Sequence, residues 1–226
     1  MKFGPKIVTD GLVLALDAAN PNSYPGSGTA WNDLTPNKNN GTLVNGPTFD
    51  SANGGSIVFD SINDMVIIPY NTNFNLCNIT NWTISIWIKL LDVTGAFNCI
   101  IGQWQQNSTN DAWLLSHSNG TIGFAWAPFS LLNNFLTSDT PLVVGDWTNV
   151  VLVKNTNTFT LYQNTGSVGV ATNSSTKSAN YQVELGRYGG SSSYIGAQYS
   201  NILLYNRALS ETEILQNYNA LKDRFI

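Results

Sequence analysis

The chain has 226 residues and a formal net charge of −4, and only 11% of its residues are charged while 42% are hydrophobic. Its ten Lys and Arg are scattered singly, which argues against nucleic acid or an anionic membrane surface as partners, because both need clustered cations. No apolar run is long enough for a signal peptide or a membrane-spanning helix, so we expect a soluble protein that is cytosolic, released by lysis or missing its targeting segment. A polar surface of amides and hydroxyls is compatible with uncharged sugars as ligands, and equally with an ordinary solvated sheet.

Strand-like runs fill most of the chain. The first is LVLALD, which leads into a stretch rich in Asn, Gly, Pro and Ser that is typical of loops with short strands. Further strands are predicted at 56–60, 64–69, 82–90, 99–104, 112–118, 121–127, 147–155, 158–164, 183–188 and 200–206. Asn-Gly pairs at 40–41, 45–46, 53–54 and 119–120 are typical of left-handed hairpin turns, and the last pair lies between two predicted strands.

The run WTISIWIKL alternates most clearly, with Trp82, Ile84, Ile86 and Ile88 on one face. About a dozen short strands with no helices between them predict an all-β fold, an antiparallel sandwich that forms a single domain over residues 1–226. Four tryptophans within these runs or at their starts are expected in the core: Trp82, Trp113, Trp126 and Trp147.

A helix is predicted near the carboxyl terminus, in contrast to the strands before it. Ser210 and Glu213 have the spacing of a capping box, in which each side chain accepts from the other residue's backbone N–H. Apolar residues follow at helical spacing, so we expect one stripe of this helix to pack on the sandwich. The stripe consists of Leu209, Ile214, Leu215, Tyr218 and Leu221.

The strand NILLYN followed by RALSETEI resembles the LamG-type jelly-roll domain of the concanavalin A-like lectin/glucanase superfamily. GGSIVFDSINDMVIIP, WTISIWIKL and GDWTNVVLVKNTNTFTLYQNTG resemble further blocks of that family in the same order, so the resemblance covers about residues 11–225. It implies an antiparallel jelly-roll β-sandwich with a short C-terminal helix. The amino-terminal part is also similar to stand-alone proteins of tailed bacteriophages, particularly marine and cyanobacterial ones, which implies a place in the virion.

The family includes glucanases, but the residues that they need are not recognisable here. Jelly-roll glucanases use two or three carboxylates on one strand, in a pattern such as Glu-x-Asp-x-x-Glu. Glu184 has no acidic neighbour along its strand, and Glu211 and Glu213 belong to the predicted helix start. The single histidine, His117, has no nucleophile motif beside it. We therefore expect no catalytic residues and no enzymatic activity.

The resemblance suggests two places for calcium. In pentraxin-like members the metal lies between loops that match NSTNDAW and LGRYGGSSS, but Arg187 stands where that pattern has acids. In the wider family a structural calcium occurs at an Asp-Gly-x-x-Asp turn, matched here by Asp60 and Asp64, with Ser61 in place of Gly and Asn201 where an acid is frequent. We expect either a calcium site at Asp60 and Asp64 or an Asx-type turn held by their hydrogen bonds.

Cys77 and Cys99 are the only cysteines and have no His or Cys partners nearby, which makes a poor metal motif. Two thiols are expected, and a disulfide between them is the alternative.

The two loops of the pentraxin-like site are the candidate ligand site. Sugar sites combine aromatic faces, which stack on C–H groups, with planar amides, carboxylates or Arg that pair with hydroxyls. The alternative interpretation is structural, with Trp104 in the core and Arg187 paired with Asp111 on the surface. The candidate ligand-binding residues are Gln103, Trp104, Asn110, Asp111, Arg187, Tyr188 and Tyr194.

Together these features predict a non-catalytic domain of a phage particle that binds glycans on a host surface. Exposed loops would supply the contacts, and several copies, for example in a homo-oligomer, would supply avidity. The alternative is a structural virion protein, such as a capsid or fibre decoration, that contacts other virion proteins and binds no sugar. A groove lined by Trp104, Arg187 and Tyr188 would favour the first hypothesis, and a trimer or an embedded surface patch the second.

Overall fold

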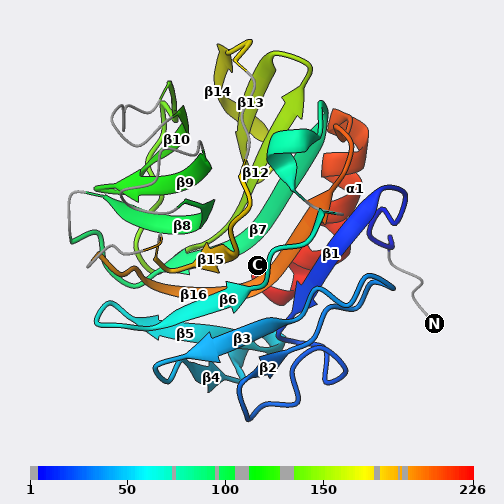
Figure 1. The fold of residues 1–226 in the computed structure, drawn as a ribbon. Coiled ribbons are helices and arrows are strands. Elements are labelled where there is room, and N and C mark those ends of the chain that lie inside the picture. Colours follow the sequence, from blue (N-terminus) through cyan, green and yellow to red (C-terminus); the bar gives the residue numbers. More distant parts are fainter. Residues whose placement is uncertain are drawn as a thin grey trace.

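Two eight-stranded antiparallel sheets lie face to face and form a β-sandwich, with one short helix near the carboxyl terminus (Figure 1). The computed structural model describes residues 5–72, 75–94, 97–104, 112–127, 135–175, 179–187, 189 and 193–226. The two antiparallel sheets and the short helix confirm the predicted fold class, an antiparallel β-sandwich with a short C-terminal helix. Within the described part of the chain, no helix has the length and apolar character needed to cross a bilayer.

The first sheet is built around its longest strand. Its strands, in spatial order, are β14 (Gly166–Thr172), β13 (Thr158–Gln163), β12 (Trp147–Asn155), β7 (Trp82–Leu90), β16 (Gly196–Tyr205), β5 (Ser56–Asp60) and β4 (Thr48–Asp50), and β1 (Leu12–Asp17) also pairs with β16. One edge of β16 pairs with β7. The first half of its other edge pairs with β5 and the second half with β1. Strand β16 thus joins segments from both ends of the chain.

The second sheet covers the inner face of the first. Its strands, in spatial order, are β11 (Leu136–Thr137), β10 (Thr121–Ala127), β9 (Ala112–Ser118), β8 (Asn98–Gln103), β15 (Val183–Leu185), β6 (Met65–Ile68), β3 (Gly41–Val44) and β2 (Ala30–Trp31). Within the described ranges, three short 3-10 helices lie in the connections and after the α-helix: η1 (Ala52–Gly54), η3 (Leu76–Asn78) and η5 (Lys222–Arg224).

The strands with strong alternation lie where the sequence predicts them. Residues 56–60, 82–90, 112–118, 121–127 and 147–155 are strands over the predicted ranges. The predicted strand at 200–206 is only the second half of β16, which begins at Gly196. Strand β14 was not predicted, because its sequence GSVGVAT contains two glycines and it lies at the exposed edge of the first sheet.

The Asn119-Gly120 pair forms the predicted left-handed turn of the β9–β10 hairpin, with φ of 49° and 83°. The pairs at 45–46 and 53–54 also have positive φ. The prediction for Asn40-Gly41 is wrong, because Gly41 begins strand β3. A Cβ on Gly41 would lie 2.8 Å from Val66 Cγ1, so this glycine permits close packing of neighbouring strands and makes no turn.

An aromatic cluster fills one part of the space between the sheets. The ring centroid of Trp82 lies 6.0 Å from Phe124, 6.0 Å from Trp126 and 5.9 Å from Phe159. The inward face of β7 carries Trp82 and the three predicted isoleucines, all of them buried. These contacts confirm the predicted facing of the central strand.

Three of the four tryptophans expected in the core are buried there, and Trp147 is not. Trp147 shares the outer face of β12 with Val151 and is only partly buried. Its ring lies 4.8 Å from that of Phe225, near the end of the chain. Alternation along the strand explains the difference, because odd-numbered residues of β12 point away from the second sheet.

The helix α1 (Glu211–Leu221) covers the outer face of the first sheet. Its predicted capping box is confirmed: the Ser210 side chain accepts from the Glu213 N–H, and the Glu213 carboxylate accepts from the Ser210 N–H. Leu209, Ile214 and Leu221 are buried as predicted. Leu215 is the exception, because it points to solvent with 46% of its surface exposed.

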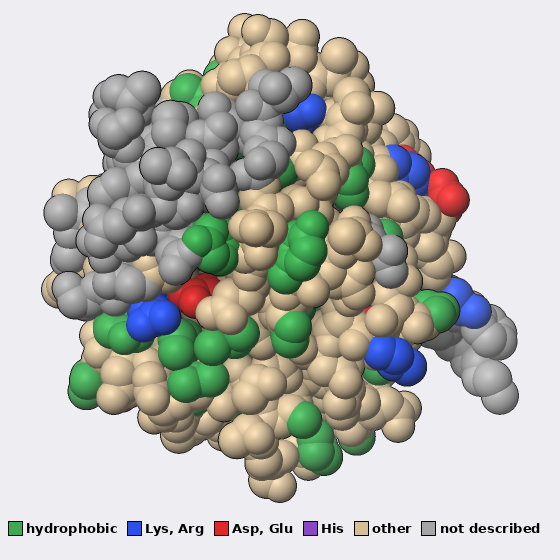
Figure 2. Space-filling model, viewed as in Figure 1, with side chains coloured by type: hydrophobic (Ala, Val, Ile, Leu, Met, Phe, Trp, Pro, Cys, Tyr) green, Lys and Arg blue, Asp and Glu red, His purple; other side chains and the backbone are tan. Residues whose placement is uncertain are grey.

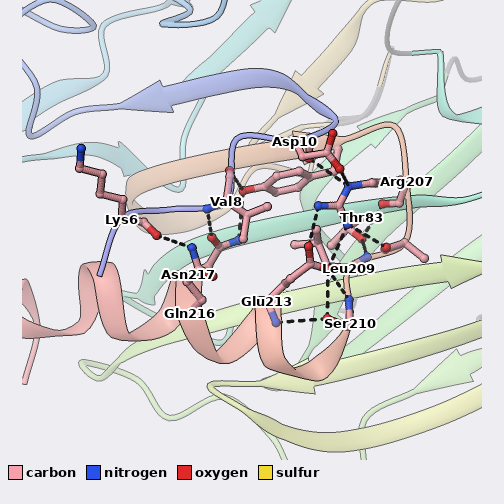
Figure 3. A network of polar contacts seen from close by, with 12 residues as sticks. Lys6, Val8, Asp10, Thr83, Arg207, Leu209, Ser210, Glu213, Gln216 and Asn217 are labelled. Carbon is pink, nitrogen blue, oxygen red and sulfur yellow. Dashed lines mark hydrogen bonds and ion pairs between the residues drawn. The ribbon is translucent and has the colours of Figure 1, made fainter. Parts of the chain in front are cut away.

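Polar contacts fix the helix to the strands beneath it (Figure 3). Thr83 Oγ1 donates to the Arg207 carbonyl and accepts from the Leu209 N–H, so β7 holds the turn before the helix. The Arg207 guanidinium pairs with the Glu213 carboxylate at 2.7 Å and with that of Asp10 at 2.8 Å. The helix start, the last strand and the amino-terminal segment are therefore tied together.

Candidate functional site

Arg187 and Tyr194, two of the predicted ligand-binding residues, lie together after strand β15. The guanidinium carbon of Arg187 lies 5.9 Å from the centroid of the Tyr194 ring, and Arg187 Nη1 donates to the Tyr194 hydroxyl at 3.4 Å. The backbone N–H of Ile195 donates to the carbonyl of Gly186, which closes the loop that carries both side chains. The structure therefore brings together a cation and an aromatic ring that the sequence names as ligand-binding candidates.

The partner of Arg187 is Glu184, on the outer face of the second sheet. Arg187 Nε lies 3.4 Å from Glu184 Oε2, and Gln182 Nε2 donates to Glu184 Oε1 at 2.6 Å. Only 3% of Glu184 is exposed. The carboxylate is thus compensated by one cation and one amide, and Arg187 is held in place by it. Asp111, the partner considered from the sequence, lies outside the described residues.

Gln103 and Trp104 are both buried. Gln103 is 1% exposed, its Nε2 donates to the Tyr181 carbonyl at 2.7 Å, and its Oε1 accepts from Trp113 Nε1 at 3.1 Å. Trp104 is 3% exposed and packs in a small apolar cluster on the outer side of the second sheet with Cys99, Leu114 and Ala125. Both side chains support the sheet and do not face solvent. Asn110 and Tyr188, the other predicted ligand-binding residues, lie outside the described residues.

Asp60 and Asp64 form the Asx-type turn considered from the sequence. Asp60 Oδ1 accepts from the backbone N–H groups of Ile62 at 2.8 Å and Asn63 at 3.3 Å, and Asp64 Oδ2 accepts from the Asp60 N–H at 3.1 Å. Burial and the charge of Asp60 raise the pKa of Asp64. Asn201 belongs to the part of β16 that pairs with β1, away from this turn.

A calcium ion would need six to eight oxygen ligands, and two carboxylates that already accept backbone hydrogen bonds fit it poorly. Among the described residues no group of three His, Cys, Asp or Glu side chains could hold a metal. Calcium at Asp60 and Asp64 therefore stays a prediction.

A hydrogen bond from the Ser61 hydroxyl to the Asp92 carboxylate fixes the same turn to the segment after β7. Ser61 has φ of 66°, in the left-handed region. The first residue of β16, Gly196, lies against both side chains, and a Cβ there would come within 2.2 Å of Asp92 Oδ2 and of Ser61 Oγ. A methyl group at this position would displace the Ser61 and Asp92 side chains, whose hydrogen bond fixes the turn.

Cys77 and Cys99 are both thiols, as expected. Cys99 is fully buried beneath the outer side of the second sheet, and burial raises the pKa of its thiol well above the usual value. Cys77 lies in η3 and is partly exposed.

A hollow of about 300 Å³ opens where strand β6 ends and strand β3 begins. The exposed ring of Tyr70 is one wall, and the other lining residues carry amides, a hydroxyl or an amine, apart from one proline. They are Lys38, Asn39, Asn40, Thr42, Pro69 and Asn71. Strands β3 and β6 are paired with Thr42 opposite Ile67, so the residues just before β3 and just after β6 meet at one rim.

The loop on one side of this hollow is held by a buried carboxylate. Asp33 is 2% exposed and accepts from the backbone N–H groups of Ala15, Thr35 and Asn39 and from the Thr35 hydroxyl. Asn39 in turn accepts at Oδ1 from Asn71 Nδ2 at 2.8 Å, across the hollow. These bonds set the shape of the hollow before any ligand binds.

Sequence reasoning did not find this hollow. Its signal was present as the run NKNN at 37–40 and a tyrosine directly after a predicted strand. Only the pairing of β3 with β6 places these two segments beside each other.

Figure 2 shows one face of the molecule, on which charged side chains are sparse.

Solved structures with a similar fold come from several kinds of protein. A sialidase of Trypanosoma rangeli in complex with 2,3-difluorosialic acid is 14% identical, with a TM-score of 0.71, and the match covers 97% of this chain and 34% of that one. The binding domain of Paraclostridial Mosquitocidal Protein 1 is 19% identical, with a TM-score of 0.69, and the match covers 93% of this chain and 52% of that one. This chain thus spans about a third of the sialidase and half of the toxin domain.

Domain 4 of AbnA, an extracellular GH43 arabinanase from Geobacillus stearothermophilus, in complex with arabinotriose, is similar over nearly its whole length. It is 16% identical with a TM-score of 0.71, and the match covers 92% of this chain and 98% of that domain. At these identities the structures show a common fold only. No curated protein sequence matches the chain.

The sequence itself also matches a family. Residues 59–215, from the end of β5 to the first half of α1, match the sequence profile of the Concanavalin A-like lectin/glucanases superfamily. This range includes the Asp60–Asp64 turn, the central strands and the capping box, which are blocks on which the resemblance rests. The chain belongs to the concanavalin A-like lectin/glucanases superfamily.

Proposed function

We propose that this protein is a non-catalytic carbohydrate-binding domain. Its sugar site is the hollow of about 300 Å³ beside Tyr70, called the Tyr70 hollow from here on. The observation that carries the proposal is the exposure of the Tyr70 ring, 40%, beside the side chains of Asn40 and Asn71. An exposed aromatic face can stack on the C–H groups of a sugar ring, and neighbouring amides can donate to and accept from its hydroxyls. The volume of the hollow is at the lower end of the range of small-molecule sites.

The rigidity of the hollow supports this function. Asp33 holds the loop 33–40 by four hydrogen bonds, and Asn75 Nδ2 lies 3.4 Å from the Tyr70 hydroxyl. A preorganised site loses less conformational entropy when it binds, so the few contacts that a sugar makes yield more affinity. Two similar folds are a domain in complex with arabinotriose and the binding domain of a toxin, which supports a binding role for this fold.

We propose a non-catalytic domain because two glutamate carboxylates are already engaged in contacts within the protein. Glu184 is compensated by Arg187 and Gln182, and Glu213 is used in the capping box and in the ion pair with Arg207. A retaining or inverting glycosidase instead needs two carboxyl groups that face the same glycosidic bond.

The loop with Arg187 and Tyr194 is the second candidate for the sugar site. Its cation and ring are adjacent and partly exposed, which is the combination that the sequence predicts. Arg187 is already engaged by Glu184 and Tyr194, which leaves fewer of its N–H groups for a ligand.

The proposal includes a place on a phage particle, with glycans of the host surface as ligands. The resemblance read from the amino-terminal sequence suggests the particle, and the low content of charged residues, 11%, suits uncharged glycans. Repeated copies on a particle would raise the avidity of a weak site. The alternative function, a capsid or fibre decoration that contacts other virion proteins, predicts that no sugar binds.

A glycan array with the purified protein tests the function, and single variants locate the site. For the glycans that the unmodified protein binds on the array, Tyr70→Ala should lower the affinity by about tenfold, equal to about 1.4 kcal/mol. Tyr194→Ala is the matched control, because it removes the same side chain from the second candidate loop and should leave these glycans bound. If only Tyr194→Ala abolishes glycan binding, the sugar site is the loop with Arg187. A folded protein that binds no glycan would favour the structural virion role.

A further inference from the structure

A second hollow, of about 220 Å³, opens at an end of the sandwich where strand β12 turns into β13. One wall is the segment that leads into β7, and another is the end of β14. Neutral polar side chains predominate in its lining, among them Asn78, Thr80, Asn157, Asn173 and Ser175.

Lys154 is the one cation among the described residues of this lining. It lies near the end of β12 on the face that carries the core residues Val150 and Leu152, so its chain points toward the space between the sheets. Only 8% of Lys154 is exposed. Its amine lies 5.9 Å from the centroid of the Trp126 ring and 5.7 Å from that of Phe159. The two rings and the burial set the position of the charge.

The charge of Lys154 lacks a carboxylate partner among the described residues. Its ammonium donates to the Thr80 carbonyl at 2.5 Å, which uses one of its three N–H groups. The residues that the structure describes around the hollow include no acidic side chain. Lysines are rarely this buried without an ionic partner, because desolvation disfavours the charged form. Burial accordingly lowers the pKa of Lys154.

The rim of the hollow is suited to a ligand with hydroxyl groups. The backbone N–H of Asn173 donates to the Asn157 carbonyl, and Asn173 Oδ1 accepts from the N–H and the hydroxyl of Ser175. The Trp126 indole donates to the Ser175 carbonyl at 3.1 Å. These bonds fix the rim, and they leave the Asn157 side chain and the Asn173 amide nitrogen as groups that can pair with hydroxyls.

We infer that this hollow binds the anionic group of an acidic sugar, a carboxylate or a sulfate, with Lys154 as its charge partner. The inference rests on the proposed carbohydrate-binding function and adds a second subsite to it, distinct from the Tyr70 hollow. The anion accepts from the Lys154 ammonium, and the sugar ring lies toward Asn157 and Asn173. A neutral sugar lacks the charge that compensates the buried ammonium, so it binds here more weakly.

Cys77 provides a direct measurement of occupancy, because its thiol lines the same hollow and Cys99 is fully buried. The rate of Cys77 alkylation by iodoacetamide is measured with glucuronate, galacturonate, N-acetylneuraminate, glucose 6-sulfate, glucose and inorganic sulfate as probes. At a concentration about ten times the Kd, a bound ligand should slow alkylation by about tenfold, since only the empty fraction reacts. We expect protection by at least one acidic sugar and none by glucose.

The variant Lys154→Met should abolish this protection, and Lys154→Arg should retain part of it. Lys89→Met is the matched control, because Lys89 also lies over a tryptophan ring, at 5.3 Å from Trp147, but does not line the hollow. Protection by inorganic sulfate alone would overturn the assignment to a sugar, and protection by no probe would overturn the site. A Tyr70-dependent array signal would in that case still support the proposed function, so the two failures are distinguishable.

Discussion

Asn217 of helix α1 and Tyr205 at the end of β16 are both buried and joined by a hydrogen bond of 3.0 Å from Asn217 Nδ2 to the Tyr205 hydroxyl. Both also bind Val8: its N–H donates to Asn217 Oδ1 at 2.8 Å, and its carbonyl accepts from the Tyr205 hydroxyl at 3.0 Å. The three groups form a closed set in which every donor and acceptor involved has a partner. Burial, the largest influence on this phenol, raises the pKa of Tyr205 to about 12, so it stays protonated.

Replacing Asn217 by Ala should therefore destabilise the fold by about 2 kcal/mol, because it leaves the Val8 N–H buried without an acceptor. Urea unfolding monitored by tryptophan fluorescence measures the change. Gln216→Ala is the control: Gln216 donates to the Lys6 carbonyl from an exposed position, so its loss should cost less. Equal costs for the two variants would contradict a special role of the buried set.

The capping box gives a pH-dependent prediction. Hydrogen bonds from Arg207 and then from the Ser210 backbone lower the pKa of Glu213 from 4.5 to about 2. The folded state therefore favours the ionised form. The stability that Glu213 contributes is present above pH 4.5 and is lost as the pH falls toward 2. Glu213→Gln should flatten the unfolding free energy over this range, and Ser210→Ala should cost about 1 kcal/mol at pH 7.

His117 titrates in a different window. It is 1% exposed, neither ring nitrogen has a hydrogen-bond partner in the described part of the chain, and burial lowers its pKa from 6.5 to about 4. Between pH 4 and pH 6.5, His117 therefore binds a proton more readily in the unfolded chain than in the folded protein. Stability should fall by about 3 kcal/mol as the pH drops from 6.5 to 4.

The variant His117→Leu should remove this dependence without a loss of stability at pH 7, because no hydrogen bond is broken. Chemical denaturation at pH 7, 6 and 5 measures it, above the range in which Glu213 titrates. An unchanged slope in the variant would assign the pH dependence to other groups.

Gly196→Ala should destabilise the turn at Asp60–Asp64 by about 1–3 kcal/mol, because the new methyl group overlaps Asp92 and Ser61. Gly166→Ala is the matched control: the nearest atom to its Cβ, the Gln163 carbonyl oxygen, would lie 3.8 Å away. Thermal unfolding should separate the two variants. Equal unfolding temperatures for the two variants would show that the turn accommodates the methyl group without loss of stability.

The sequence predicts the sandwich and its central strands well because β7 and β12 combine β-branched and aromatic residues with clear alternation. It does not predict which helical residues face the sheet as reliably. Leu215 is apolar but lies about 100° around the helix from Ile214, and the buried position one turn on is the polar Asn217.

The candidate site is predictable only in part. Arg187 and Tyr194 are close in sequence, and their contact follows from a short loop. The sequence proposes Gln103 and Trp104 as ligand-binding residues, with a core position for Trp104 as the alternative. It does not show the bulge between Cys99 and Ile101 that changes which side chains of β8 face inward, Gln103 among them. The Tyr70 hollow depends on the pairing of two strands about 25 residues apart, and such pairings leave no local signal.

The position of β16 has a consequence for how the chain folds. This strand lies between β7 on one side and β5 and β1 on the other, although it follows all three of them along the chain. Until residues 196–205 leave the ribosome, three parts of the first sheet stay separate and keep unpaired edges: the strands from β14 to β7, the β5–β4 pair, and β1. We therefore expect the sandwich to close late in synthesis, and a chain that stalls before β16 to depend on chaperones to avoid aggregation.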